Sequence, residues 1–112
     1  MYTYRIKGFK KIYDGDTITV LIDLGFGVTK EEKIRLAFID APEIRGEERL
    51  EGLKSRDWLR ERLLTAFNNG EEIIIRTLKD RKGKYGRYLG EIFINDISIN
   101  KEMIQEGYAL AY

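Results

Sequence analysis

Two segments of the chain alternate between apolar and polar residues with a period of two, and this pattern constrains the fold more than any other sequence feature. In residues 17–24 the apolar positions are Ile18, Val20, Ile22 and Leu24. After a break at Gly25-Phe26-Gly27, residues 33–39 resume the pattern with Ile34, Leu36 and Phe38. Successive side chains of a strand point to opposite faces, so such alternation is typical of a half-buried strand. The two segments predict a β-hairpin.

The rest of the chain predicts three further strands and two helices. Residues 2–13 are rich in β-branched and aromatic residues and end at the turn dipeptide Asp14-Gly15, which indicates a first strand. Strands are also predicted at 73–78 and 87–94. Leu59, Leu63, Ala66 and Phe67 share one helical stripe, so we expect a helix at 53–67 that is closed by Asn68-Asn69-Gly70.

The third strand and the C-terminal segment carry boundary signals. Pro42 stops the third strand, and the polar segment 43–51 predicts a surface loop. Asn100 is a candidate N-cap for a short helix that ends at Gly107. Three strands, a helix, two strands and a short helix form the order of a β-rich α+β fold. We expect a five-stranded, antiparallel Greek-key barrel of the oligonucleotide-binding (OB) type.

The 112 residues predict one domain over 1–112, without repeats or low-complexity linkers, and we expect a monomer. The longest apolar runs, such as 73–75, are far too short to span a bilayer. No signal peptide is visible after Met1. The sequence therefore predicts a cytoplasmic protein if Met1 is the native start, and a secreted one if an export signal has been removed.

Several kinds of site are excluded by composition. The chain has neither cysteine nor histidine, so it cannot build a Cys/His zinc site, a thiol nucleophile or a triad that needs imidazole. The net charge is only +1, yet residues 79–87 hold five cations (Lys79, Arg81, Lys82, Lys84 and Arg87) against one anion, Asp80. A solvated turn is the simpler interpretation of this run, and binding of an anionic ligand is the alternative.

Three carboxylates lie at the predicted ends of strands. Asp16 begins the second strand, and Asp40 and Glu43 follow the third across the Ala41-Pro42 turn. Asp-Gly is a common turn former, so Asp16 alone favours a turn. Carboxylates three residues apart on a stiffened turn can instead converge on one point, and such hard oxygen ligands suit Ca²⁺ or Mg²⁺.

Two arginines are candidate functional residues. Arg35 lies inside the apolar segment 34–38, where an unpaired charge is expensive to bury, so it requires either a neighbouring carboxylate or an anionic ligand. Tyr85-Gly86-Arg87 brings a second guanidinium and a phenol to the start of the strand at 87–94. A tight turn with incidental charge is the competing interpretation.

Taken together, four segments resemble the thermonuclease, or staphylococcal-nuclease-like, family. They are Asp14-Gly15-Asp16-Thr17, Ile34-Arg35-Leu36, Ile39-Asp40-Ala41-Pro42-Glu43 and Lys84-Tyr85-Gly86-Arg87. The likeness continues through Asn100 to the segment 107–112. Four short motifs in the correct order and spacing are far more specific than any one of them.

The resemblance implies an enzyme with one Ca²⁺ ion. Asp16, Asp40 and the backbone carbonyl of Ala41 correspond to the metal ligands. Glu43 corresponds to the residue that orients or deprotonates the attacking water, and Arg35 and Arg87 to the groups that grip the phosphate. Lys84, Tyr85 and Tyr112 correspond to substrate-binding residues. Members of the family cleave DNA and RNA at the 5′ P–O bond with little base specificity and leave 3′-phosphates.

Two alternatives belong to other classes of function. Related domains that have lost the carboxylates serve as non-catalytic modules that bind nucleic acid or protein. A generic oligonucleotide-binding adaptor would bind without metal. Because all three carboxylates and both arginines are present, the sequence favours the metal-dependent nuclease.

Overall fold

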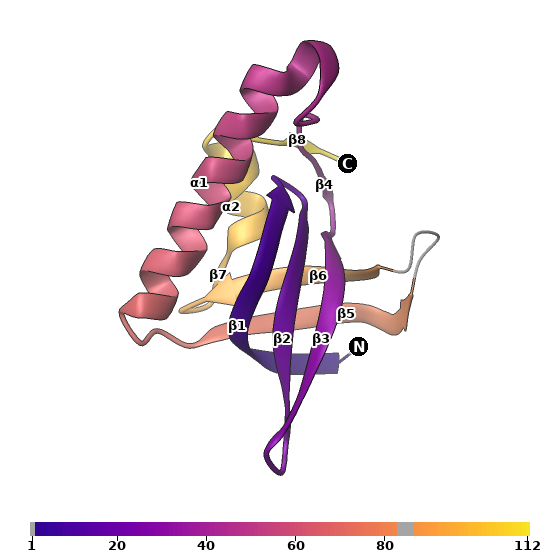
Figure 1. Ribbon diagram of the computed structural model, residues 1–112, viewed down its shortest axis with the longest axis vertical. Helices are drawn as coiled ribbons and strands as arrows, with labels where there is room; N and C mark the ends of the chain where they lie inside the picture. Colours follow the sequence, from indigo (N-terminus) through magenta and orange to yellow (C-terminus); the bar gives the residue numbers. More distant parts are fainter. Residues whose placement is uncertain (1, 83–86) are drawn as a thin grey trace.

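Five strands form a closed barrel in the computed structural model, which describes residues 2–82 and 87–112 (Figure 1). They are β1 (Tyr2–Asp14), β2 (Thr17–Gly25), β3 (Val28–Leu36), β5 (Ile73–Lys82) and β6 (Tyr88–Ile94). The strand order is β3-β2-β1-β5-β6, and a pairing between β3 and β6 closes the sheet on itself. The predicted five-stranded barrel is confirmed. Its closing pair is parallel, however, so the prediction that all five strands are antiparallel was wrong at this pair.

Shorter elements extend this barrel. β7 (Ile97–Ser98) lengthens the sheet beside β6, and β4 (Ile39–Asp40) pairs with β8 (Leu110–Ala111) in a separate two-stranded ribbon. A 3-10 turn, η1 (Gly46–Glu48), leads into α1 (Arg49–Asn68), and α2 (Ile99–Gln105) follows β7. Both helices lie on the same side of the barrel, where α1 packs against β1 and α2 against β6 (Figure 1). In the described part of the chain, no helix is both long and apolar enough to cross a membrane.

The core lies inside the barrel and beneath the two helices. Its largest fully buried side chains are Ile18, Ile34, Leu36, Ile39, Leu59, Leu63, Ile73, Ile75, Ile92, Ile94, Ile99 and Met103. The alternating positions of β2 and β3 supply the inward face, while the stripe on α1 covers the barrel. The same alternation sends Thr17, Thr19 and Arg35 to the outer face, where the candidate site forms.

The third strand differs from its prediction at both ends. It begins at Val28, five residues before the predicted start, because the hairpin with β2 extends beyond the barrel as a solvent-exposed arm. It ends at Leu36, and Phe38 is half exposed with a positive φ of 68°. The prediction that Phe38 continues the buried face was therefore wrong, because the chain turns there before β4.

Both helices also begin differently from the prediction. α1 starts at Arg49, inside the predicted surface loop 43–51. The prediction missed this start because Arg49, Leu50 and Glu51 are all exposed and give no core-facing periodicity. Ser98 caps α2 by accepting a hydrogen bond from the backbone N–H of Lys101, so the prediction that Asn100 is the cap was wrong. Asn100 is instead fully buried. Its side chain accepts from the N–H of Ile92 and donates to the carbonyls of Ala37 and Gly90.

Candidate active site

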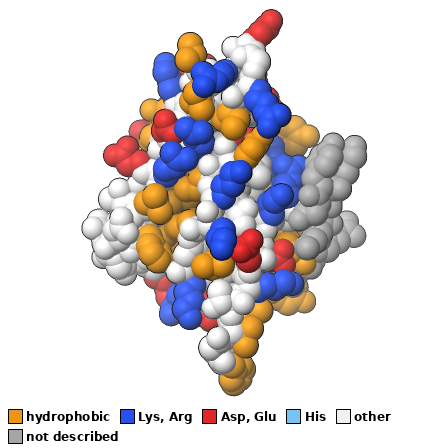
Figure 2. All heavy atoms as spheres, viewed as in Figure 1, with side chains coloured by type: hydrophobic (Ala, Val, Ile, Leu, Met, Phe, Trp, Pro, Cys, Tyr) orange, Lys and Arg blue, Asp and Glu red, His pale blue; other side chains and the backbone are white. Residues whose placement is uncertain are grey.

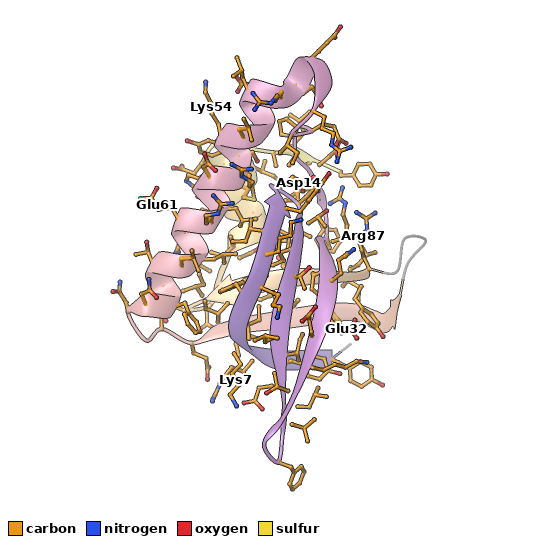
Figure 3. All side chains as sticks on the ribbon, viewed as in Figure 1. Lys7, Asp14, Glu32, Lys54, Glu61 and Arg87 are labelled. Atoms are coloured by element: carbon orange, nitrogen blue, oxygen red, sulfur yellow. The ribbon has the colours of Figure 1, made fainter. Side chains whose placement is uncertain are left out.

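A polar pocket of about 450 Å³ opens on the outer face of the barrel, where β1, β2 and β3 reach the segment 40–43. Its lining includes the five charged residues that the sequence singled out: Asp16, Arg35, Asp40, Glu43 and Arg87. Figure 3 shows the labelled Asp14 and Arg87 near the same end of the β1–β3 layer. The fold thus brings together charges from four separate stretches of the chain.

Asp16 is held rigidly at the turn between β1 and β2. The backbone N–H of Asp16 donates to Oδ1 of Asp14 over 3.0 Å, which forms the turn that the Asp-Gly dipeptide predicts. Its own carboxylate is 9% exposed, accepts from the N–H of Ala41 over 2.8 Å and receives the hydroxyl of Thr17 over 3.2 Å. One carboxylate therefore ties the β1–β2 turn to the segment that carries Asp40.

The β1–β2 turn lies directly on α1. A Cβ at Gly15 would overlap the hydroxyl of Ser55, a buried residue of α1 whose Oγ donates to the carbonyl of Tyr108 over 2.8 Å. Glycine at position 15 permits this close approach. The packing of this turn on α1 thereby helps to position Asp16 in the pocket.

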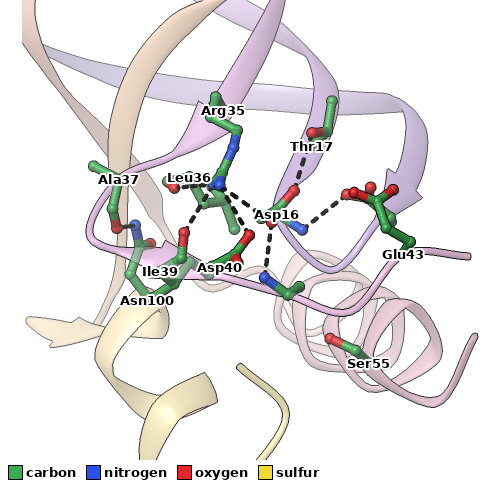
Figure 4. A network of polar contacts seen from close by, with 12 residues as sticks. Asp16, Thr17, Arg35, Leu36, Ala37, Ile39, Asp40, Glu43, Ser55 and Asn100 are labelled. Atoms are coloured by element: carbon green, nitrogen blue, oxygen red, sulfur yellow. Dashed lines mark hydrogen bonds and ion pairs between the residues drawn. The ribbon is translucent and has the colours of Figure 1, made fainter. Parts of the chain in front are cut away.

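Arg35 is the centre of the polar network in Figure 4. Its Nη1 donates to the carbonyls of Leu36 and Ile39 over 2.7 and 3.0 Å. Its Nη2 lies 3.4 Å from the Asp16 carboxylate and 3.6 Å from that of Asp40. Arg35 thus has the neighbouring carboxylates that the sequence predicted as one alternative, and two backbone carbonyls in addition, while 18% of its side chain stays exposed.

The Asp40 segment is stabilised by the end of the chain. β4 pairs with β8 so that Asp40 faces Leu110 and Ile39 faces Ala111, and the N–H of Tyr112 donates to the carbonyl of Phe38 over 2.9 Å. The side chain of Asp40 is 59% exposed at the pocket. Tyr112 is 87% exposed and lies beside this ribbon rather than in the pocket lining.

Glu43 is an exposed residue, but its backbone is tightly packed against α1. Its N–H donates to the carboxylate of Glu48 over 3.0 Å. Behind it, a Cβ on Gly52 of α1 would overlap the Glu43 carbonyl oxygen. Gly52 therefore sets how closely the helix approaches the catalytic candidate, a role that sequence reasoning missed because an isolated helical glycine gives no sign of its partner.

Arg87 reaches the pocket through barrel closure. In the parallel pairing Arg35 is the register partner of Leu89, so Arg87, two residues before Leu89, lies toward the same face as Arg35. Its Nη1 donates to the hydroxyl of Thr17 over 3.4 Å. The other predicted substrate-binding residues of this region, Lys84 and Tyr85, lie outside the described residues.

Negative charge is crowded at this turn. The pKa of Asp14 is raised from 3.8 to about 6, chiefly by burial and then by the side-chain hydrogen bond and negative charge of Asp16 and the charge of Glu43, while the hydrogen bond from the Asp16 N–H lowers it. A cation placed among these groups would offset the repulsion. The turn therefore favours a positive ligand electrostatically.

The donor set fits a hard divalent cation. Asp16 and Asp40 both contact the same nitrogen of Arg35, so their carboxylates face a common region, and carboxylate and carbonyl oxygens are the ligands that such ions prefer. Among the described residues no group of three carboxylates stands ready to hold a metal ion. The expected ligand set of two aspartates and the Ala41 carbonyl, with water completing the shell, stays a prediction.

Six further residues line the pocket that sequence reasoning did not assign to the site: Lys11, Tyr13, Asp14, Thr17, Thr19 and Lys33. Asp14 and Thr17 belong to the turn motif and could have been inferred from it. The others lie at outward positions of β1, β2 and β3, and only strand register shows that they are neighbours of Arg35.

The chain is similar to known proteins over most of its length. The family model described as "Staphylococcal nuclease homologue" matches residues 33–112. The Bacillus subtilis protein named "Endonuclease YhcR" is 32% identical over 91% of this chain and 8% of its own length. A Haemophilus influenzae protein named "Uncharacterized endonuclease" is 36% identical over 91% of this chain and 49% of its own length. "Uncharacterized protein MJ1439" of Methanocaldococcus jannaschii is 33% identical over 91% of this chain and 56% of its own length. This chain thus spans little more than half of these relatives at most.

Proposed function

Since this chain belongs to the family of staphylococcal nuclease homologues, we propose that it is a Ca²⁺-dependent nuclease that hydrolyses phosphodiester bonds in DNA and RNA. The observation that carries the proposal is the convergence of Asp16, Arg35, Asp40, Glu43 and Arg87 on one pocket. Two of the relatives are named endonucleases, which supports the same reaction class.

In this proposal two kinds of positive charge act on the phosphate, a bound cation and two arginine side chains. Asp16, Asp40 and the Ala41 carbonyl would hold the cation, which supplies Lewis-acid polarisation of a phosphoryl oxygen when bound. Arg35 and Arg87 would donate to the phosphate oxygens, where negative charge increases as the nucleophile attacks. Arg35 must exchange a carboxylate partner for a phosphate oxygen as substrate binds.

Glu43 would act on the attacking water. Its exposed side chain lines the pocket and can accept the proton that the water loses. Attack at phosphorus then breaks the bond to the 5′ oxygen, which takes up a proton, and the phosphate stays on the 3′ side. The close contact of Gly52 with the Glu43 backbone supports this role, because a general base must be positioned accurately.

Low base specificity follows from the chemistry of the pocket. Its described lining is charged or hydroxyl-bearing, which suits the phosphate backbone rather than base edges. Contacts to phosphate position a nucleic acid without reading its sequence. We therefore propose that DNA and RNA of mixed sequence are both substrates.

The test is hydrolysis of single-stranded DNA by the purified chain with Ca²⁺ or with chelator. We expect cleavage that stops in chelator, and Glu43→Gln and Arg87→Ala each to reduce kcat by about 10²-fold or more. Circular dichroism would show that both variants are folded. Full activity in chelator or in Glu43→Gln would refute the mechanism, and tight DNA binding without cleavage under any metal would identify a non-catalytic binding module.

A further inference from the structure

Two lysines and a threonine form a row across the outer face of three adjacent strands. Lys11 of β1 pairs with Thr19 of β2, and Thr19 pairs in turn with Lys33 of β3. All three line the same pocket as Arg35, yet none belongs to the proposed catalytic set. We call Lys11, Thr19 and Lys33 the basic row.

The basic row lies beside Arg35, one of the two arginines proposed to bind the scissile phosphate. On β2 and β3, Thr17 pairs with Arg35 just as Thr19 pairs with Lys33. Lys33 and Arg35 are two residues apart on one strand, so they lie on the same face about 7 Å from each other. That offset is comparable to the distance between successive phosphates of an extended strand.

The two lysine charges are available to an anion. Both side chains are exposed, and in the described ranges 2–82 and 87–112 neither is part of an ion pair. By contrast, Lys10 is paired with Glu31 and Lys30 with Glu32. The Nζ of Lys11 lies 5.4 Å from the ring centre of Tyr13, a cation–π contact that holds the ammonium group at the pocket. Figure 2 shows Lys and Arg side chains gathered over this face.

We propose that the basic row binds the backbone phosphate adjacent to the scissile phosphodiester. Lys11 and Lys33 would flank that phosphate from opposite sides, and the Thr19 hydroxyl between them would donate to one of its oxygens. The inference rests on the proposed nuclease function and deepens it, because it defines the substrate as a polynucleotide strand that extends past the cleaved bond. A substrate with a single phosphodiester cannot use the row.

The experiment compares two substrates and two variants. Hydrolysis of a dinucleoside monophosphate, which contains only the scissile phosphodiester, is measured beside that of a twelve-nucleotide single-stranded DNA. The test variant is Lys11→Ala/Lys33→Ala. The control is Lys54→Ala, which removes an exposed lysine from α1, away from the pocket (Figure 3).

We expect the double variant to lower kcat/KM for the long substrate about tenfold while kcat/KM for the short one stays within about twofold. In the Glu43→Gln background, the slope of log Kd against log salt concentration for the twelve-nucleotide DNA should decrease by about 0.7 for each lysine removed. Lys54→Ala should change none of these values.

The outcomes separate this inference from the proposed function. If the unaltered protein cleaves neither substrate, the nuclease proposal has failed. If it cleaves both and the double variant matches it on the long one, the basic row is not a subsite although the nuclease stands. An equal loss on both substrates would also overturn the inference, because the lysines would then serve folding or the chemical step.

Discussion

Gly52 packs against the peptide of Glu43 so closely that a methyl group at residue 52 would overlap the Glu43 carbonyl oxygen and approach the amide nitrogen of Ile44. The contact joins the first turn of α1 to the segment that carries the candidate base. A helix that covers the core is therefore also the support of an exposed carboxylate of the pocket.

Gly52→Ala should lower both stability and activity, although helix propensity alone would predict a more stable helix. Alanine favours an exposed helix by up to about 1 kcal/mol over glycine, yet here it must displace backbone. We expect the free energy of unfolding in urea to fall by about 1–3 kcal/mol and kcat for single-stranded DNA to fall at least about tenfold. The matched control is Gly8→Ala, whose Cβ would lie 3.4 Å from Leu21, an ordinary contact. A Gly52→Ala protein that is more stable and fully active would contradict the packing argument.

Asn100 should be a major contributor to stability. Its buried side chain joins the end of β3 to β6 and α2 through three hydrogen bonds of 2.8–3.1 Å. Removal leaves buried backbone groups unsatisfied, so Asn100→Ala should lower the free energy of unfolding by about 2–4 kcal/mol. Asn100→Asp keeps the acceptor but loses both donors and should also destabilise. Its exposed neighbour gives the control, since Lys101→Ala should stay within about 0.5 kcal/mol. Equal stability of all three variants would show that the network is unimportant.

Asp14 should make the metal-free protein less stable as the pH rises. Its pKa is about 6 in the folded chain and 3.8 as the ordinary value, so between these values the folded state binds more protons than the unfolded one. The destabilisation is absent below pH 3.8 and complete above pH 6. With allowance for solvent screening it is on the order of 1–2 kcal/mol.

The measurement for Asp14 is urea unfolding in chelator across pH 3.5–8 (a range set by the two pKa values). Asp14→Asn keeps an oxygen that can accept from the N–H of Asp16 and removes the charge. It should therefore be more stable than the unaltered protein at pH 7.5, and the difference should vanish near pH 3.5. A difference that is independent of pH would mean that the carboxylate charge is not its cause.

The sequence predicted elements wherever side chains contact the core. The alternation in β2 gave bounds that agree with the structure to one residue, and the stripe Leu59, Leu63 and Ala66 located α1. Prediction failed where backbone pairing alone decides the structure. Residues 28–33 belong to β3 although most are exposed, because hydrogen bonds to β2 hold the projecting hairpin together.

The same distinction applies to the site. Short motifs located the five charged residues, and the structure places them in one pocket, while their chemical roles stay predictions. No local pattern could relate Lys11 to Lys33 or Gly52 to Glu43, because each pair meets only through sheet register or helix packing. Asn100 was singled out as a helix cap, which was wrong. Its side-chain amide instead bonds the N–H of Ile92 and the carbonyl of Ala37, close to where β3 pairs with β6.

The parallel β3–β6 pairing has a kinetic consequence. Residues 34–36 pair with residues 88–90, so this ladder joins segments that are far apart in the chain and closes a long loop. Contacts of such high contact order are slow to form. Arg35 and Arg87 reach the same pocket only after this pairing has formed. Under the proposed function, nuclease activity recovered during refolding would therefore report closure of the barrel rather than the earlier appearance of helix or hairpin.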